Sequence, residues 1–128
     1  MNEKIKEFIL ANRVLTLGLN VENKPYCANL FYIFDEEELA LLFISHPNSK
    51  HIKENDFVSV AIYSLNPIKG IQAQARLNIA TKRQKKLFLS KEKKANFALG
   101  YEIYSLSLDY IKYTDNTLLL AKKIEFKR

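Results

Sequence analysis

The sequence predicts an antiparallel β-barrel with a short N-terminal helix and further helices at its periphery, built as a single domain over residues 1–128. Short apolar segments recur along the chain and are separated by polar turn sequences, a spacing typical of barrels. The segment 71–79 alternates strictly between apolar and polar residues, as a half-buried strand does. With 128 residues, of which 48% are hydrophobic, the chain is long enough to bury one core without a metal or a disulfide.

Hydrophobic periodicity and capping residues define the predicted elements. Residues 2–12 place Ile5, Phe8 and Ile9 on one face of a helix, with Asn12 as its C-terminal cap. Thr81 and Gln84 form a capping-box pattern that opens a second, basic helix, and Gly100 ends this helical region. The predicted strands cover residues 14–20, 25–35, 39–45, 57–64, 71–79, 102–113 and 118–126.

The strands predicted at 25–35, 39–45 and 57–64 are largely apolar on both faces. Such strands need cover on each side, which a barrel interior and a partner subunit would together supply. The single cysteine, Cys27, excludes an internal disulfide and is expected to be a small buried thiol. No apolar run approaches the length of a membrane span and the N-terminus does not resemble a signal peptide, so we expect a cytoplasmic protein that does not enter a membrane.

The formal net charge is +6, and basic residues concentrate in 82–94 and 122–128. Clusters of this kind attract nucleic acid, anionic membranes or phosphate ligands. A binding module for single-stranded nucleic acid is therefore an alternative function. We favour the plainer interpretation of a solvated helix face and a frayed C-terminal tail, because the aromatic residues do not interleave with the basic ones as they do in nucleic-acid binders.

The segment that follows the predicted strand 39–45 is the best candidate for an anion site. The strand ends at Ser45, and a polar turn leads into a short predicted helix over residues 50–54, closed by Asn55. Free amides at a helix start, beside a lysine and hydroxyl groups, suit a phosphate. The alternative is a simple helix cap with exposed neighbours. The candidate residues are Ser45, His46, Ser49, Lys50 and His51.

Two polar residues on other predicted strands complete the candidates. Asn29 lies inside an otherwise apolar strand, where a buried amide needs either a backbone partner or a ligand. Gln72 begins the polar face of 71–79, where exposure to solvent is the plainer expectation. The chain shows no metal-ligand spacing and no nucleophile motif, so any reactive atom would belong to a cofactor. On a barrel, the anion site suggests a phosphorylated one.

Two motifs resemble a known family. Residues 26–35 read YCANLFYIFD, and residues 112–117 read KYTDNT and are followed by Lys122 and Lys123. Both are similar to the YhbP-like proteins, which belong to the pyridoxamine 5'-phosphate oxidase-like FMN-binding split barrels. The resemblance implies a homodimer of six- or seven-stranded split barrels, with FMN in clefts at the subunit interface.

The resemblance also implies roles for particular residues. Asn29 and Leu30 would lie along the flavin ring and Ser45 and His46 near its edge, with His46 the best candidate for a proton donor. Gln72 would follow the superfamily glutamine that reaches the ring or the ribityl chain. The phosphate would be held by Ser49, Lys50 and His51, and Lys122 or Lys123 would come from the partner subunit.

Departures from the family pattern narrow the expected activity. True pyridoxamine phosphate oxidases have Ser-Arg-Lys where this chain has Ser49, Lys50 and His51, a basic residue in place of Asn29, and a C-terminal tryptophan that this chain lacks. Oxidation of pyridoxamine phosphate is therefore not expected. The expectation is an FMN-dependent oxidoreductase or flavin carrier with a small-molecule redox partner. The alternative within the same cleft is a non-enzymatic protein that binds another phosphorylated or planar ligand.

Overall fold

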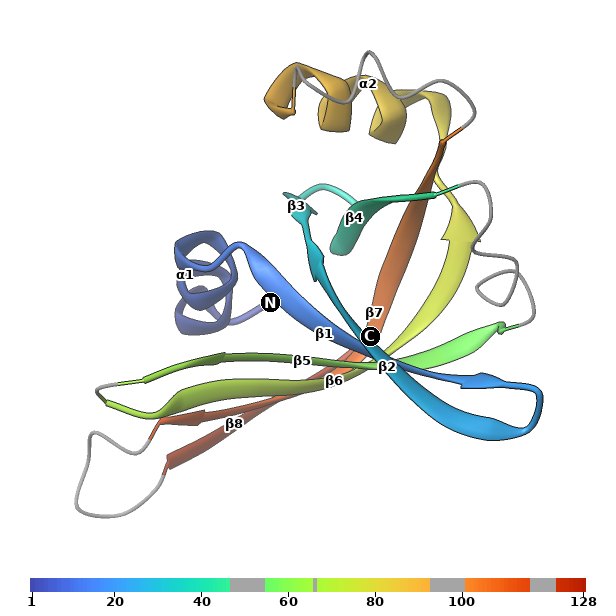
Figure 1. Cartoon of the computed structure of the whole chain (residues 1–128). Coiled ribbons are helices and arrows are strands. Elements are labelled where there is room, and N and C mark those ends of the chain that lie inside the picture. Colours follow the sequence, from blue (N-terminus) through green and yellow to red (C-terminus); the bar gives the residue numbers. More distant parts are fainter. Residues whose placement is uncertain (47–54, 66, 93–100, 116–121) are drawn as a thin grey trace.

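The computed structural model describes residues 1–46, 55–65, 67–92, 101–115 and 122–128. They form a strongly curled antiparallel sheet with two helices outside it (Figure 1). The elements are α1 (Glu3–Ala11), β1 (Val14–Val21), β2 (Lys24–Phe31), β3 (Ile33–Asp35), β4 (Ala40–Ser45), β5 (Phe57–Ser64), β6 (Lys69–Ile79), α2 (Lys82–Lys91), β7 (Glu102–Asp115) and β8 (Lys122–Lys127).

The strand order is β2-β1-β5-β6-β7-β4-β3, and β8 pairs with the second half of β7. Every one of these pairings is antiparallel. β2 and β3 stand at opposite ends of this order, yet a single residue separates them in the chain. The sheet therefore curls back on itself at this residue, which confirms the predicted antiparallel barrel with peripheral helices.

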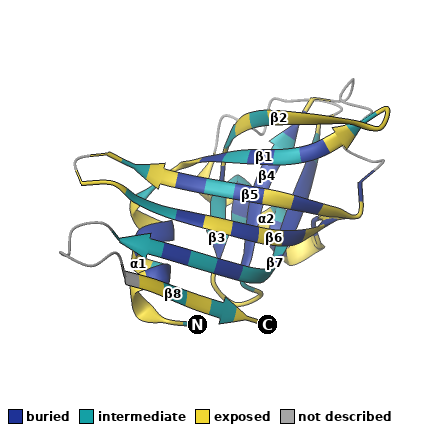
Figure 2. Ribbon diagram, turned by 90° about the horizontal axis from the view of Figure 1, so that it is seen from below, coloured by how far each residue is buried: buried dark blue, intermediate teal, exposed yellow. Residues whose placement is uncertain are grey.

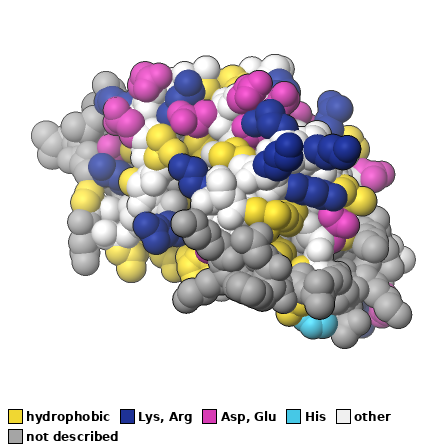
Figure 3. All heavy atoms as spheres, turned by 90° about the horizontal axis from the view of Figure 1, so that it is seen from above, with side chains coloured by type: hydrophobic (Ala, Val, Ile, Leu, Met, Phe, Trp, Pro, Cys, Tyr) yellow, Lys and Arg dark blue, Asp and Glu magenta, His cyan; other side chains and the backbone are white. Residues whose placement is uncertain are grey.

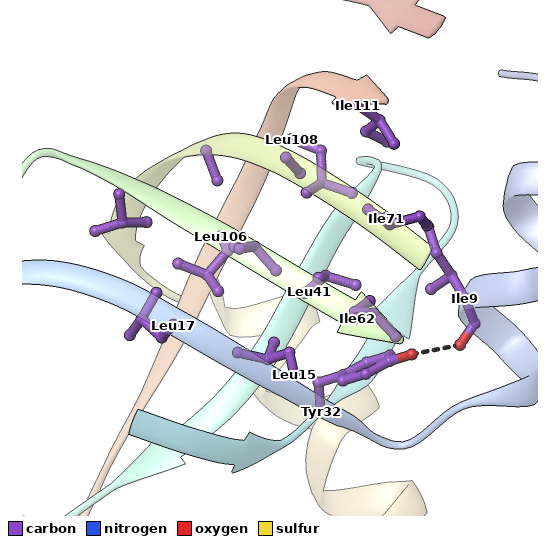
Figure 4. Close-up of a cluster of buried hydrophobic side chains, with 14 of the residues drawn as sticks. Ile9, Leu15, Leu17, Tyr32, Leu41, Ile62, Ile71, Leu106, Leu108 and Ile111 are labelled. Carbon is purple, nitrogen blue, oxygen red and sulfur yellow. Dashed lines mark hydrogen bonds between the residues drawn. The ribbon is translucent and has the colours of Figure 1, made fainter. Parts of the chain in front are cut away.

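Tyr32 is the residue at which the predicted strand 25–35 divides into β2 and β3. Its backbone N–H donates to the carbonyl of Arg13 at 3.0 Å, and its buried hydroxyl donates to the carbonyl of Ile9 at 2.7 Å (Figure 4). The chain pairs with β1 as far as Phe31 and with β4 from Ile33 onward. This division gives eight strands where six or seven were expected, within the predicted fold class.

The main core fills the curled sheet. Buried residues alternate with half-buried ones along β1 and with exposed ones along most of β6 (Figure 2), as the sequence of 71–79 predicted. The helix α1 adds Ile5, Phe8 and Ile9 to this core and is capped at Asn12, both as expected. The largest fully buried side chains of this core are Phe43, Ile5, Ile9, Leu15, Leu17, Leu41, Ile62, Leu106, Leu108 and Ile111.

A second, smaller core lies under α2. Phe88 packs there with Leu42 and Ile103. The predicted capping box is present: the Thr81 hydroxyl accepts from the Gln84 N–H at 3.2 Å, and the Gln84 side chain accepts from the Thr81 N–H at 3.0 Å. The helix therefore begins where its sequence predicted.

Some details of the prediction are wrong or lie outside the described residues. The C-terminal end is not frayed, because residues 122–127 form β8 and the Arg128 guanidinium donates to the carbonyl of Leu108 at 2.9 Å. Cys27 is exposed rather than buried, because β2 ends the strand order and Cys27 faces outward beside Gly18. Leu39 lies in the turn before β4 with φ of 52°, not in the strand. The predicted helix 50–54, the helix end at Gly100 and the strand start at 118–121 lie outside the described residues.

Candidate functional site

The candidate site is the opening where β2 and β4 separate. β3 pairs with β4, and Ile33 lies opposite Leu42. Because the pairing is antiparallel, each residue before Ile33 would lie opposite the next residue along β4 if the pairing continued. Continued through Tyr32, this register would set Leu30 opposite Ser45 and Asn29 opposite His46. The chain instead turns to β1 at Tyr32, and β2 and the end of β4 become the two sides of an unclosed seam. The sequence predicted both sides of this seam as ring-contacting residues.

A cleft of about 1000 Å³ runs along this seam. Asn29 and Leu30 line it from β2, and Ile44 lines it from β4. Burial of Tyr32, which lines the same cleft, raises the pKa of its hydroxyl, so this group stays protonated and keeps donating to Ile9. The end of α1 and the last turn of α2 form the outer walls.

Ser45 and His46 end β4 beside the cleft. Ser45 is buried, and its hydroxyl makes one long hydrogen bond among the described residues, 3.5 Å to the carbonyl of His46. His46 is exposed, and its ring meets the edge of Tyr101 with the ring centroids 5.0 Å apart. Tyr101 also lines the cleft. A hydroxyl with spare capacity and an imidazole held by an aromatic ring therefore stand at the end of one strand.

Asn29 is exposed, and the expectation of a buried amide is wrong. Its Oδ1 accepts from the Thr16 hydroxyl at 2.6 Å across the β1–β2 pair. The bond fixes the side-chain oxygen, so the amide nitrogen is the group that remains to donate. Exposure follows from the position of β2 at the end of the strand order.

Gln72 does not line this cleft. Asn29, Thr16, Ala61 and Gln72 lie in one row across the outer face of the sheet, on β2, β1, β5 and β6. Three strand spacings separate Asn29 from Gln72, or about 14 Å. Lys123 lies further along, on β8 beside Thr114 of β7. Gln72 and Lys123 are exposed.

The structure does not describe the side chains of the remaining predicted site residues. Ser49, Lys50 and His51 are outside the described residues, and Lys122 is described only as the first backbone position of β8. Their roles stay predictions.

The outer face of the sheet carries a second, shallower hollow of about 860 Å³. Its floor includes Gly18, where a Cβ would lie 2.3 Å from the Ser59 hydroxyl. Large apolar side chains stand exposed on the same face, including Phe57 and Tyr63. An apolar face of this extent is typical of a surface that is covered by another molecule.

The basic helix α2 is partly neutralised. Arg83 pairs with Asp35 and Glu37, and Lys85 pairs with Glu102 at 3.1 Å. Figure 3, seen from the α2 side, shows Lys and Arg side chains gathered there with carboxylates beside them. This arrangement resembles a solvated helix face more than a nucleic-acid surface.

Neither a metal centre nor a membrane span is found in the described part of the chain. Those residues contain no group of three or more His, Cys, Asp or Glu side chains that could hold a metal ion. Among the described helices, none has both the length and the apolar character needed to cross a bilayer.

Sequence reasoning missed several residues of the cleft. Arg13, Tyr101 and Lys91 line it from three separate parts of the chain. No local motif marks them, because the fold alone brings them together.

Comparison with solved structures defines the class of fold. General Stress Protein 26 from Bacillus anthracis matches with a TM-score of 0.76 at 20% identity, covering 97% of each chain. A pyridoxamine 5'-phosphate oxidase-related, FMN binding protein from Nostoc punctiforme matches with a TM-score of 0.69 at 13% identity, covering 98% of this chain and 85% of that one. A heme binding protein from Mycobacterium smegmatis matches at 0.80 and 11% identity, covering 98% and 57%. The chain has the split-barrel fold of the pyridoxamine 5'-phosphate oxidase-like proteins.

Sequence relatives define the family. UPF0306 protein C8J_1355 of Campylobacter jejuni is 39% identical over 132 aligned positions, covering 98% of each chain. UPF0306 protein plu4501 of Photorhabdus laumondii is 30% identical, covering 97% of this chain and 94% of the relative. UPF0306 protein YhbP of Salmonella newport is 25% identical, covering 97% and 91%. No family model matches the chain. The chain belongs to the UPF0306, or YhbP, family, as the two motifs indicated.

Proposed function

We propose that this chain is an FMN-binding protein that holds the flavin at the seam between β2 and β4. The observation that carries the proposal is the cleft that Asn29 and Leu30 line from β2 and Ile44 lines from β4, directly before Ser45 and His46 in the chain. Support also comes from a similar fold in a protein described as FMN binding. Because solved structures of this fold include a heme binder as well, the fold alone does not choose between flavin and other planar ligands.

The residues at the seam fit a flavin. The isoalloxazine ring needs apolar walls with a few polar groups at its edge. Leu30 and Ile44 supply apolar walls, and the Asn29 amide and the Ser45 hydroxyl supply hydrogen-bonding groups. When bound, FMN would supply transfer of a hydride or of electrons. In this proposal His46, steadied by Tyr101, would hold a proton near the ring edge.

The phosphate would be held by Ser49, Lys50 and His51, just beyond the end of β4. A lysine gives a point charge and the serine a short hydrogen bond. Two residues, Pro47 and Asn48, separate them from His46 in the chain. This order would place the ring at the seam and the phosphate further along the same segment.

A second copy of the chain would complete the cleft. The exposed aromatic residues of the outer face need cover. Gln72 lies too far from Asn29 to reach the same ring, so a glutamine contact would come from the other copy, as would Lys122 or Lys123. The proposed assembly is therefore a homodimer with shared sites.

Flavin titration tests the proposal. Purified protein is titrated with FMN and with riboflavin, which lacks the phosphate, and bound flavin is measured by fluorescence quenching. We expect FMN to bind at micromolar concentration or tighter and riboflavin to bind more weakly. Lys50→Ala should weaken FMN about tenfold, the value of a charge-assisted hydrogen bond, and leave riboflavin unchanged. Lys86→Ala, on the exposed face of α2, is the control. Absence of FMN binding to the wild type at micromolar flavin would refute the proposal.

A second candidate is a different planar ligand in the same cleft. This candidate is supported by the similarity of the fold to that of a heme binding protein. The visible spectrum of freshly purified protein separates the two. A flavin band supports the first proposal, and a different chromophore supports the second.

A further inference from the structure

The cleft extends well beyond the seam. From Asn29 and Ile44 it continues between the end of α1 and the last turn of α2. Its volume, about 1000 Å³, lies at the upper end of the range for small-molecule sites. A site of this size has room for a second small molecule beside the ring of a bound flavin.

This outer part of the cleft exposes large apolar side chains. Leu10 is 57% exposed, Phe31 73% and Tyr101 42%. The last two are aromatic and offer ring faces or edges for stacking. Half-buried Ile33 and Leu87 continue the apolar lining. An aromatic ligand would remove this surface from water, so the lining favours one.

The charges of the described residues that line the cleft balance. Arg13 and Lys91 are matched in number by Glu36 and Glu92, and none of the four forms an ion pair within the described part of the chain. A ligand with a net charge would lose hydration here without meeting a net opposite charge.

The carbonyl groups at the two helix ends are partly satisfied. The Asn12 side chain donates to the carbonyl of Phe8 at 2.8 Å. At the end of α2, the Ser90 hydroxyl donates to Leu87 at 2.7 Å and the Glu92 N–H to Phe88 at 2.8 Å. The helix ends therefore add little attraction for a cation.

We infer that the outer part of this cleft binds a flat, uncharged aromatic molecule next to the proposed flavin. A role of this molecule as a redox partner of the flavin rests on the proposed function, but its binding to the cleft does not. The expected substrate class is an apolar aromatic compound rather than a phosphorylated or carboxylated metabolite. Contact would come from Phe31, Tyr101 and Leu10.

A matched ligand series tests the charge argument. 2-Naphthol, 2-naphthoate and 2-naphthylmethylammonium share one ring system and are uncharged, anionic and cationic at neutral pH. Equilibrium dialysis against flavin-free protein should show that 2-naphthol binds about tenfold tighter than either ion, the cost of a partly desolvated charge. Tighter binding of either ion, or no binding of any of the three, overturns the inference.

A pair of variants tests the location. Leu10→Lys puts a charge into the cleft at an exposed helix position, and Leu65→Lys makes the same change at an exposed position outside it. Leu10→Lys should weaken 2-naphthol about tenfold, because the ligand then buries less apolar surface of the protein, and Leu65→Lys should change it less than twofold. Equal effects of the two variants overturn the location.

Competition with flavin separates this inference from the proposed function. With FMN saturating, 2-naphthol should still bind with an affinity within about threefold of that for the flavin-free protein, since the two molecules occupy different parts of the cleft. Competitive displacement by FMN means that the cleft holds one ligand and overturns the inference. If the wild type binds 2-naphthol as expected but not FMN, the proposed function fails and this inference stands.

Discussion

Asp35 is the most deeply buried charged residue in the described part of the chain. Its carboxylate accepts from Arg83, and also from the Gln84 side chain at 3.0 Å. The same Gln84 amide donates to the Ser105 hydroxyl at 3.2 Å. Burial raises the pKa of Asp35, but the hydrogen bonds from Arg83 and Gln84 lower it by more, so the pKa lies below its ordinary value. This network ties α2 to the turn after β3.

Removing the Asp35 carboxylate should destabilise the protein. Asp35→Ala leaves the Gln84 amide with one partner fewer, at a cost of about 2 kcal/mol in the free energy of unfolding. Urea unfolding measures the change. The control is Lys85→Ala, which breaks an ion pair with Glu102 at partly exposed side chains and should cost little.

The same carboxylate predicts a pH dependence. Because the folded state lowers its pKa, its stabilisation is complete above the ordinary value of 3.8 and is lost as the pH falls through the lower pKa of the folded state. Asp35→Asn should therefore flatten the acid limb of the urea midpoint plotted against pH. An unchanged acid limb would contradict the assigned pKa direction.

Local patterns predicted some residues and not others. The capping box of Thr81 and Gln84 is a short-range pattern, and both of its bonds are present. The burial of Asp35 depends on packing of α2 from 49 residues away, where Gln84 meets it. Along β2, the exposure of Asn29 and Cys27 was missed, because the sequence of a strand does not reveal whether the strand lies at the end of the strand order.

At the level of elements, the sequence predicted strands well where periodicity is strong. The strictly alternating strand predicted at 71–79 lies within β6, which begins two residues earlier. The division at Tyr32 was missed because its bonding partners, Arg13 and Ile9, come from the first helix and its connection to β1. The long apolar segment 25–35 was therefore predicted as one strand.

Arg128 fixes the turn between β3 and β4. Its guanidinium donates to the carbonyls of Glu38 at 2.8 Å and Leu39 at 2.9 Å, and to that of Leu108 at 2.9 Å. Leu39 holds a φ of 52°, which costs free energy in a residue other than glycine. The bonds from Arg128 stabilise this conformation.

Loss of these bonds should loosen the turn. Arg128→Ala is expected to lower the free energy of unfolding by about 1 kcal/mol, the net value of a hydrogen bond. Amide hydrogen exchange should accelerate over residues 36–41 in particular. Lys127→Ala, at an exposed neighbouring position, serves as the comparison. Equal exchange in the two variants would rule out this role.

For the whole molecule, the outer face of the sheet should be an interface between two copies. A two-fold interface uses the same surface on both partners, so a charge near its middle is repeated across it. Ala61 lies between Thr16 and Gln72 in the row that crosses this face.

Ala61→Arg should convert a dimer into a monomer and weaken FMN binding with it, because each proposed site needs both copies. Sedimentation velocity gives the oligomeric state, and flavin titration gives the second readout. Lys86→Glu, on α2, should leave both unchanged. A wild-type protein that is monomeric at concentrations where it binds FMN would disprove the shared site.

The change of partner at Tyr32 has an evolutionary consequence. Residues up to Phe31 pair with one neighbouring strand and residues from Ile33 with another, so a mutation on one side need not disturb the strand pairing on the other. Descendants of one ancestral scaffold can therefore reshape a single wall of the opening while the remainder stays folded. Few substitutions are then needed for related proteins to bind chemically different ligands.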